Sequence, residues 1–448
     1  MHRLAFLALI LMASAPVAAQ ETAAERGYRF LTEKSYLPFD FDQETFDAVW
    51  KAWPEPLRSQ AEQASPDERR QMAYARYGLT PRLDDPTKPL QYVVDERGVW
   101  TMNCFACHGG QVQDKTVPGA PNAMYALETL TEEMRQTKLL MRKPLTRMDL
   151  GSLVMPLGTT NGTTNAVMFG VALMNYRDAD LNLDKSRPYP RMTHHDMDAP
   201  AWWHFKKKSH LYIDGFAEKG ARGLMQFMLV KENGPQKFRQ WEPDFEDVYA
   251  YLMSLEAPKY PFEVDAALAE RGAVAFGRVC SSCHGTYGEN ETYPEKMVAI
   301  DTVGTDRVRF DALSAARRKG YGESWFAHYG RQKTLESPEG YVAPPLDGVW
   351  ASAPFFHNGS VPTLWHVLHP DQRPKVWRRT SVAGFDQRKV GPEIELFDAL
   401  PEAATKDKRL RREYFDTKAF GKSAAGHDFV EELTNEEKTA VLEYLKTL

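Results

Sequence analysis

The sequence predicts a mainly α-helical protein in which two helical domains follow one another. Between Phe245 and Leu255, apolar residues recur at the spacing of an amphipathic helix. At the end of the chain, Thr434 and Glu437 form a capping-box pattern ahead of an apolar stripe made of Val441, Leu442, Leu445 and Leu448. Pro258, followed closely by a second proline, stops the first helix and marks the linker. A motif that uses all four cysteines also occurs twice, once in each half of the chain.

Composition places the chain among globular proteins with a large core. Its 448 residues are 43% hydrophobic and 26% charged, which excludes a disordered chain. The net charge of −5 offers no general basic surface, so we expect no nucleic-acid partner. Aromatic residues make up 12%, a content that suits contacts with a flat cofactor. Only 4 cysteines in a chain of this length argue against a disulfide scaffold.

The first residues predict a secretory signal peptide. His2 and Arg3 precede an apolar run from Leu4 to Ala13, and small residues end at Ala19, before Gln20. The alternative is a buried N-terminal helix. No later stretch approaches the ~18 apolar residues of a membrane-spanning helix. We therefore expect a periplasmic or secreted protein that does not span a membrane.

The two cysteine motifs read Cys104-Phe105-Ala106-Cys107-His108 and Cys280-Ser281-Ser282-Cys283-His284. The C-x-x-C-H pattern is typical of covalent haem c attachment. Two thiols on one helical turn can each bond a porphyrin vinyl group, and the next histidine becomes the proximal iron ligand. Zinc pairs usually lie about 15–20 residues apart, far closer than these, and a redox-active C-x-x-C pair does not require the histidine. We therefore predict two covalently attached haem c groups, with iron ligands His108 and His284.

Together with the helical pattern, these motifs predict two cytochrome c-like helical domains, each with one covalent haem. After the signal peptide (1–19), the N-terminal domain covers residues 20–258 and the C-terminal domain covers residues 259–448. A helix from Val264 to Phe276 leads into the second motif. The segment from Gly151 to Lys208 is rich in loop-forming residues, and we expect long loops over the first haem.

The residue opposite the proximal histidine decides the chemistry, because an open iron position permits reaction with oxygen or peroxide. No histidine follows His108 before His194, and the lone Met124 is more typical of a core. A cluster farther along is either a packed surface loop or a pocket over the haem. In a pocket, aromatic residues would form a distal wall or an electron relay, and histidines would act as acids or bases on bound peroxide. The candidate catalytic residues are His195, Trp202, Trp203, His204 and Phe205.

Two histidines are candidates for the second haem. His427 comes immediately before the last predicted helix, where many cytochrome domains return a ligand to the iron. His357 lies in a Phe-Phe-His-Asn-Gly string. Thr363 is expected to cap a short helix that carries Trp365 to Leu368.

Together with the two C-x-x-C-H motifs, the string Ala353-Pro354-Phe355-Phe356-His357-Asn358-Gly359 resembles the di-haem cytochrome c peroxidase superfamily. Other strings are more similar to its rubber-oxygenase branch: Thr159-Thr160-Asn161, Tyr176-Arg177-Asp178, Pro200-Ala201-Trp202-Trp203, Ser360-Val361-Pro362-Thr363-Leu364 and Gly426-His427. In that branch the N-terminal haem is open and the second haem has two histidine ligands. The resemblance implies that His427 is the distal ligand beside His284, with His357 as a pocket residue or second choice.

Departures from the peroxidase pattern favour an active N-terminal haem. The histidine that peroxidases carry soon after the first motif is absent, and so is their methionine ligand beyond the Phe-His string. The resemblance implies a peroxidase-like di-haem oxidoreductase that reacts with peroxide or dioxygen. Its expected partner is a small periplasmic cytochrome c or cupredoxin, and calcium sites occur in the superfamily. The alternatives are a dioxygenase that cleaves an apolar substrate and a non-catalytic electron-transfer cytochrome.

Overall fold

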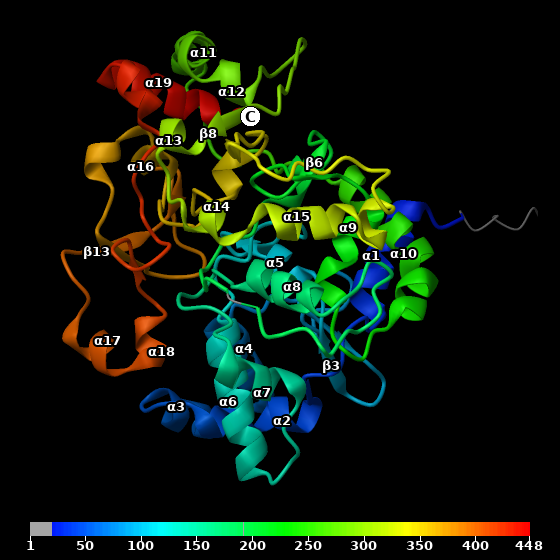
Figure 1. The fold of residues 1–448 in the computed structure, drawn as a ribbon. Coiled ribbons are helices and arrows are strands. Elements are labelled where there is room, and N and C mark those ends of the chain that lie inside the picture. Colours follow the sequence, from blue (N-terminus) through cyan, green and yellow to red (C-terminus); the bar gives the residue numbers. More distant parts are fainter. Residues whose placement is uncertain (1–19, 191) are drawn as a thin grey trace, which may run out of the picture.

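The computed structural model describes residues 20–190 and 192–448, and its fold is mainly helical (Figure 1). The predicted signal peptide lies outside the described residues. The first ten helices are α1 (Ala23–Glu33), α2 (Gln43–Ala48), α3 (Leu57–Gln63), α4 (Pro66–Tyr77), α5 (Phe105–His108), α6 (Leu127–Leu140), α7 (Arg147–Val154), α8 (Ala166–Asn175), α9 (Ala221–Leu224) and α10 (Pro235–Ser254). They are followed by α11 (Ala266–Val279), α12 (Ser281–His284), α13 (Ile300–Val303), α14 (Val308–Ala312), α15 (Ala315–Gly322), α16 (Leu364–Leu368), α17 (Glu402–Lys406), α18 (Lys408–Arg411) and α19 (Asn435–Leu445).

The strands are short and form only small antiparallel sheets, none of them closed within the described part of the chain. One sheet has the order β1 (Phe41–Asp42), β3 (Val99–Met102) and β2 (Tyr92–Val94). Another has the order β13 (Ile394–Phe397), β10 (Val376–Arg379) and β14 (Phe415–Asp416). The two-stranded pairs are β4 (Gln111–Val112) with β5 (Lys115–Thr116), β6 (His210–Leu211) with β7 (Ala217–Glu218), β8 (Met297–Ala299) with β9 (Gly340–Val342), and β11 (Phe385–Asp386) with β12 (Gly391–Pro392).

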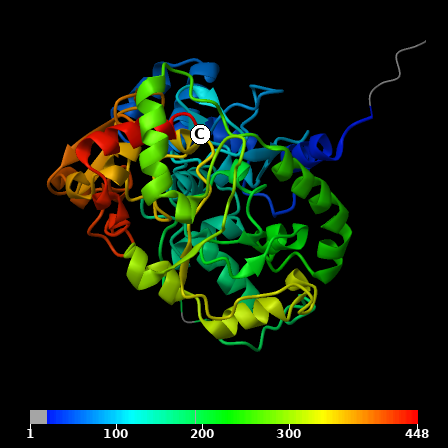
Figure 2. The same cartoon turned by 90° about the horizontal axis from the view of Figure 1, so that it is seen from above.

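Each cysteine motif is bracketed by two helices that cross at a glycine. Helix α1 crosses α10 where a Cβ on Gly27 would stand 2.1 Å from the Asp247 carbonyl oxygen. Helix α11 crosses α19 where a Cβ on Gly272 would stand 2.0 Å from the Ala440 carbonyl oxygen. Since no side chain fits at such a distance, both crossings require glycine. Figures 1 and 2 show α11 beside the C-terminal helix α19, and Figure 1 shows α1 beside α10.

The helices that the sequence predicted are present with small shifts of their ends. The helix expected from Phe245 is the second half of α10, and the lead-in helix is α11. Thr434 and Glu437 form the predicted capping box of α19, and the Thr363 hydroxyl accepts the His366 backbone N–H at the start of α16. The segment from 151 to 208 is mostly irregular, as expected, but it also contains the buried helix α8, which its composition did not indicate.

Side chains from both halves of the sequence share two apolar cores. One core combines first-half residues such as Phe216 and Phe238 with Tyr321 and Trp325, which pack on them at ring-centroid distances of 5.3 and 5.9 Å. The other core is built mainly from the last half and includes Trp203. The division at residue 258 stays a prediction.

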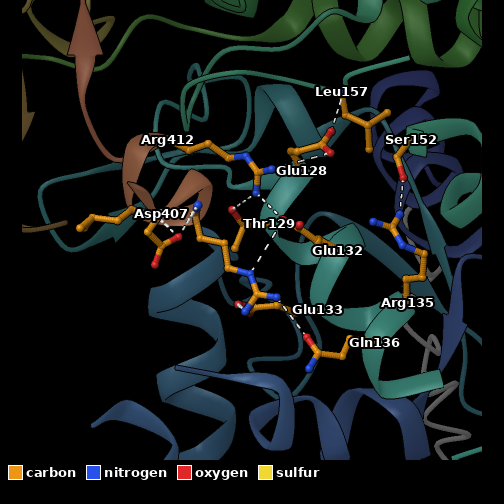
Figure 3. A network of polar contacts seen from close by, with 12 residues as sticks. Glu128, Thr129, Glu132, Glu133, Arg135, Gln136, Ser152, Leu157, Asp407 and Arg412 are labelled. Carbon is orange, nitrogen blue, oxygen red and sulfur yellow. Dashed lines mark hydrogen bonds and ion pairs between the residues drawn. The ribbon is translucent and has the colours of Figure 1, made fainter. Parts of the chain in front are cut away.

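Ion pairs also tie the C-terminal half to the N-terminal half. Arg412 binds Glu132 at 2.7 Å, and Arg409 of α18 lies 3.3 Å from the fully buried Glu133 of α6. Figure 3 shows Arg412 beside Glu128, Thr129 and Glu132 of α6. Because Glu133 also binds Arg76 at 2.6 Å, its buried charge is matched from two directions. This network fixes the loop around α17 and α18 against the N-terminal helices.

Candidate haem sites

The first motif forms a single helical turn. Cys104 is the N-cap of α5, and the side chain of Asn103 accepts the Phe105 backbone N–H at 2.9 Å. Cys107 lies on the same turn, and both cysteines are free thiols. Burial raises the pKa of the Cys104 thiol to about 12 and that of Cys107 to about 11. The pair is therefore protonated at neutral pH and sits in the apolar setting that suits a porphyrin edge.

His108 is held in a defined orientation at the end of this turn. Its Nδ1 lies 3.0 Å from the Pro200 carbonyl oxygen, and its ring stacks on Trp202 at 4.7 Å between centroids and 21° between planes. A carbonyl partner assigns the proton to Nδ1 and leaves Nε2 as a lone-pair donor for a metal. Burial lowers the pKa of His108 to about 4, so the ring is neutral and competent as a ligand.

The second motif repeats this arrangement. Its histidine, His284, ends α12, and its Nδ1 lies 2.8 Å from the Pro344 carbonyl oxygen. Tyr287 donates its hydroxyl to the His284 carbonyl at 3.1 Å and accepts the Leu346 N–H at 2.6 Å. In both motifs, a proline carbonyl from a distant part of the chain thus fixes the imidazole. Pro200 lies two residues before Trp202, and Pro344 lies three residues before Asp347.

A second imidazole faces His284. The ring centroids of His284 and His427 are 6.1 Å apart. Two imidazoles that bind one metal from opposite sides, each through a nitrogen about 2 Å from it, have centroids about 6 Å apart. The Nδ1 atom of His427 is buried without a hydrogen-bond partner, and burial together with His284 lowers the pKa of His427 to about 3. Size and chemistry both fit an iron atom between the rings.

The backbone around His427 explains how it reaches this position. His427 has a left-handed φ of 59°, and its N–H donates to the Val303 carbonyl at 2.7 Å. Gly426 precedes it, also at positive φ, where a Cβ would stand 2.2 Å from the Gly304 carbonyl carbon. Strained backbone of this kind persists where the surrounding structure holds it in place, and it is common at ligand sites.

His357 occupies a different environment. Its ring packs on Tyr341 at 4.7 Å, and its backbone carbonyl accepts the Asp198 N–H at 2.9 Å. The ring beside His427 belongs instead to the neighbouring Phe356, with the two ring centroids 6.0 Å apart. Within residues 20–190 and 192–448, no histidine ring faces His108 in the way that His427 faces His284.

The aromatic cluster lies between the two motifs. Trp202 stacks on His108 and contacts Phe105 at 5.2 Å. Trp203 and His204 both reach the Asp347 carbonyl oxygen, with Nε1 at 2.7 Å and Nε2 at 2.8 Å. Phe205 packs on Tyr249. Trp202, which stacks on His108, is therefore the sequence neighbour of Trp203, which is hydrogen-bonded to the segment that orients His284.

His195 stands apart from this cluster. Its Nδ1 lies 3.0 Å from the Thr193 carbonyl, and its buried Nε2 has no partner. The structure also brings charged residues to this region that the sequence did not single out: Arg309, Arg318, Asp214, Asp198 and Arg379. Burial raises the pKa of Asp198 well above its usual value. No local pattern marks these residues, since they come from separate loops, short helices and the end of strand β10.

The described residues contain no group of three or more His, Cys, Asp or Glu suited to a metal ion, so the calcium site stays a prediction. Among the same residues, no helix combines the length and apolarity needed to cross a bilayer.

Comparison with known proteins adds a family likeness. Residues 340–378 match the model of a family described as RoxA-like, cytochrome c-like. This segment indicates a c-type cytochrome. It also implies haem c, and it contains Pro344, Asp347 and His357. The uncharacterized protein y4iM of Sinorhizobium fredii (strain NBRC 101917 / NGR234) is 28% identical over 256 residues, which are 52% of this chain and 56% of that protein. The uncharacterized protein y4iJ of the same strain is 26% identical over 260 residues, 43% of this chain and 41% of that protein. The chain spans about half the length of the curated relatives it matches.

Proposed function

We propose that this protein is a periplasmic di-haem c-type cytochrome oxidoreductase of the peroxidase-like kind. The N-terminal haem, on Cys104, Cys107 and His108, reacts with peroxide or dioxygen. The C-terminal haem, on Cys280, Cys283 and His284, transfers electrons. The observation that carries the proposal is the difference between the two histidines: His284 faces a second imidazole at 6.1 Å, whereas the ring contact of His108 is with Trp202.

The residues around His284 favour electron transfer. His284 and His427 would together hold the iron of this haem, and two imidazole ligands would suit it to electron transfer and not to reaction with an oxidant. Both rings are held before the metal arrives, His284 by the Pro344 carbonyl and His427 by its backbone bond to Val303. Rigid ligands of this kind keep the reorganisation during electron transfer small.

The residues around His108 favour reaction at an open side. Bound haem supplies the redox chemistry there. Pro200 keeps the Nδ1 proton in place, and Trp202 fixes the plane of the ring. The Asp198 carboxyl lies close enough to Cys107 to raise the pKa of its thiol, and its own raised pKa suits a group that holds a proton near the first haem.

The route between the haems runs through the Trp202–Trp203 pair in this proposal. Trp202 contacts the His108 ring, and Trp203 is hydrogen-bonded to the Asp347 carbonyl. Asp347 lies three residues after Pro344, whose carbonyl holds His284. Continuous contacts of this kind can carry an electron from one motif to the other. A small cytochrome c or a cupredoxin would deliver or accept that electron.

A ligand titration tests the proposal. Azide, added to the oxidised protein from a strain that matures c-type cytochromes, is expected to bind at one site per two haems. Peroxide turnover with a reduced cytochrome c is then expected to disappear in parallel with azide occupancy. Binding at neither haem would leave only the electron-transfer cytochrome. Oxygen uptake with an apolar olefin, in the absence of peroxide turnover, would assign the dioxygenase activity that the resemblance to the rubber-oxygenase branch favours.

A further inference from the structure

A buried cation without hydrogen-bond partners lies on the short helix α14. The side chain of Arg309, on α14, is 1% exposed, and its Nε, Nη1 and Nη2 atoms all lack a hydrogen-bond partner. Its one ion-pair contact within the described residues is with Asp214, where Nη1 lies 3.4 Å from Oδ2 outside hydrogen-bond geometry. A guanidinium carries five N–H donors, and leaving them all unmatched in the interior is costly.

The carboxylates near Arg309 make their hydrogen bonds with other groups. Asp214 is already the partner of Arg318, which donates to Oδ2 from Nη2 at 2.8 Å and from Nε at 3.3 Å. Asp306 accepts the backbone N–H groups of Val308 and Ser423, and Asp196 pairs with Lys422 at 3.0 Å. Among the described residues, the N–H groups of Arg309 therefore remain without an acceptor.

The residues beside Arg309 are polar and poorly matched as well. Tyr341 and the imidazoles of His357 and His195 lie close enough to Arg309 to interact with its charge. The Nε2 atom of His195 and the Oδ1 atom of Asp214 are buried without partners. Both of these atoms are hydrogen-bond acceptors, so the unmatched donors of the cluster are the N–H groups of Arg309, and a buried donor set of this kind calls for an acceptor that the described residues do not supply.

Two chain segments link this cluster to the haem motifs. Tyr341, in β9, lies three residues before Pro344, whose carbonyl holds His284. The His357 carbonyl accepts the N–H of Asp198, whose carboxyl is close enough to Cys107 to influence its thiol.

We propose that Arg309 binds a carboxylate at this position. The planar guanidinium fork matches the two oxygens of a carboxylate, which accepts the unmatched N–H groups. The carboxylate is either a propionate side chain of a bound porphyrin, a source that rests on the proposed function, or a small organic acid taken up from solution.

The sign of a stability change tests the proposal. A buried cation whose N–H groups have no acceptor is destabilising, so Arg309→Met is expected to stabilise the protein if no anion is bound. If Arg309 holds a carboxylate, the same change strands a propionate or abolishes the binding of a free acid. The unfolding temperature of the haem-loaded protein, measured in sodium acetate, is then expected to fall by at least about 3 °C. Arg58→Met is the matched control, because it removes an equal charge from the surface, where Arg58 pairs with Glu55. An unfolding temperature equal to or above wild type overturns the proposal.

A second variant keeps the test valid if Arg309→Met does not accumulate. Arg309→Lys retains the charge and Arg309→Gln removes it at similar length. A carboxylate site requires the lysine variant to be the more stable of the two. A glutamine variant that is equally stable or more stable would contradict it.

Two further measurements distinguish the sources of the carboxylate. With a propionate, Arg309→Met lowers the reduction potential of one haem, because a positive charge near the iron is lost, while added acetate has no effect on wild type. With a free acid, sodium acetate raises the unfolding temperature of wild type more than sodium chloride at equal ionic strength, and Arg309→Met abolishes this difference. If neither response occurs, Arg309 binds no carboxylate, whatever the spin states of the haems.

Discussion

The imidazole rings of His284 and His427 face each other with their centroids 6.1 Å apart and their planes inclined by 60°. One ring comes from the end of a helical turn, and the other from a left-handed residue that begins the 3₁₀ turn Asp428–Glu432. The buried Nδ1 of His427 has no hydrogen-bond partner within the described residues. This relationship gives the two haem motifs different expected chemistry.

Replacement of His427 by alanine is expected to free one axial position of the second haem. The ferric spectrum of that haem should change from low spin to high spin, and its reduction potential should shift. His357→Ala is the matched control, because the His357 ring packs on Tyr341 instead and its loss should leave the spin state unchanged. The opposite pattern, with a change only in the His357 variant, would transfer the ligand role to that residue.

Removal of one cysteine pair should remove one haem. The double change Cys104→Ala with Cys107→Ala, and separately Cys280→Ala with Cys283→Ala, should each halve the haem content of the purified protein. A pyridine haemochrome assay against protein concentration measures this. Full haem content in either variant would contradict covalent attachment at that motif.

Trp203→Phe is expected to slow electron transfer between the haems several-fold. It also removes the hydrogen bond from Nε1 to the Asp347 carbonyl, at a cost of about 1 kcal/mol in the free energy of unfolding. Trp350→Phe loses a similar bond, to the Pro258 carbonyl at 2.8 Å, so it serves as the control for stability. Stopped-flow reduction separates the two effects, and equal rates in both variants would exclude Trp203 from the route.

Gly272→Ala tests the close crossing of α11 and α19. Because the new Cβ would stand 2.0 Å from the Ala440 carbonyl oxygen, the helices must separate, and we expect a loss of about 3 kcal/mol or more in the free energy of unfolding. Gly277 lies on the same helix, where a new Cβ would meet nothing within 4 Å. Gly277→Ala should therefore be stabilising by about 0.5–1 kcal/mol. Chemical denaturation measures both, and equal effects would disprove the tight crossing.

The buried His366 is expected to contribute to acid sensitivity. Burial lowers its pKa to about 4, below the usual value near 6.5, so the folded state binds fewer protons than the unfolded chain between these values. The contribution of the neutral His366 to the free energy of unfolding is fully present above pH 6.5 and is lost as the pH falls towards 4, with an upper limit of about 3 kcal/mol. In His366→Gln the free energy of unfolding should depend less steeply on pH over that window. An identical slope in both proteins would remove His366 from the explanation.

The features that the sequence could predict are those written in local patterns. The capping box at Thr434 places the last helix, and the position of His427 before it is part of the same local signal. The C-x-x-C-H spacing predicts one helical turn for each motif, and α5 and α12 have that form.

The remaining features depend on contacts between distant segments. No pattern around Arg309 indicates that its side chain meets Asp214 and lies near His357, because packing of separate loops brings them together. The bond between Trp203 and the Asp347 carbonyl is of the same kind. The sequence identified Trp203 by its type and neighbourhood, but its partner became visible only in the folded chain.

Electron paramagnetic resonance of the oxidised, haem-loaded protein distinguishes the two haem sites directly. We expect two signals of equal weight: a low-spin ferric signal with two imidazole ligands, from the His284–His427 pair, and a high-spin ferric signal from the haem on His108. Two low-spin signals, with no high-spin component at any pH at which the protein is folded, would contradict this expectation.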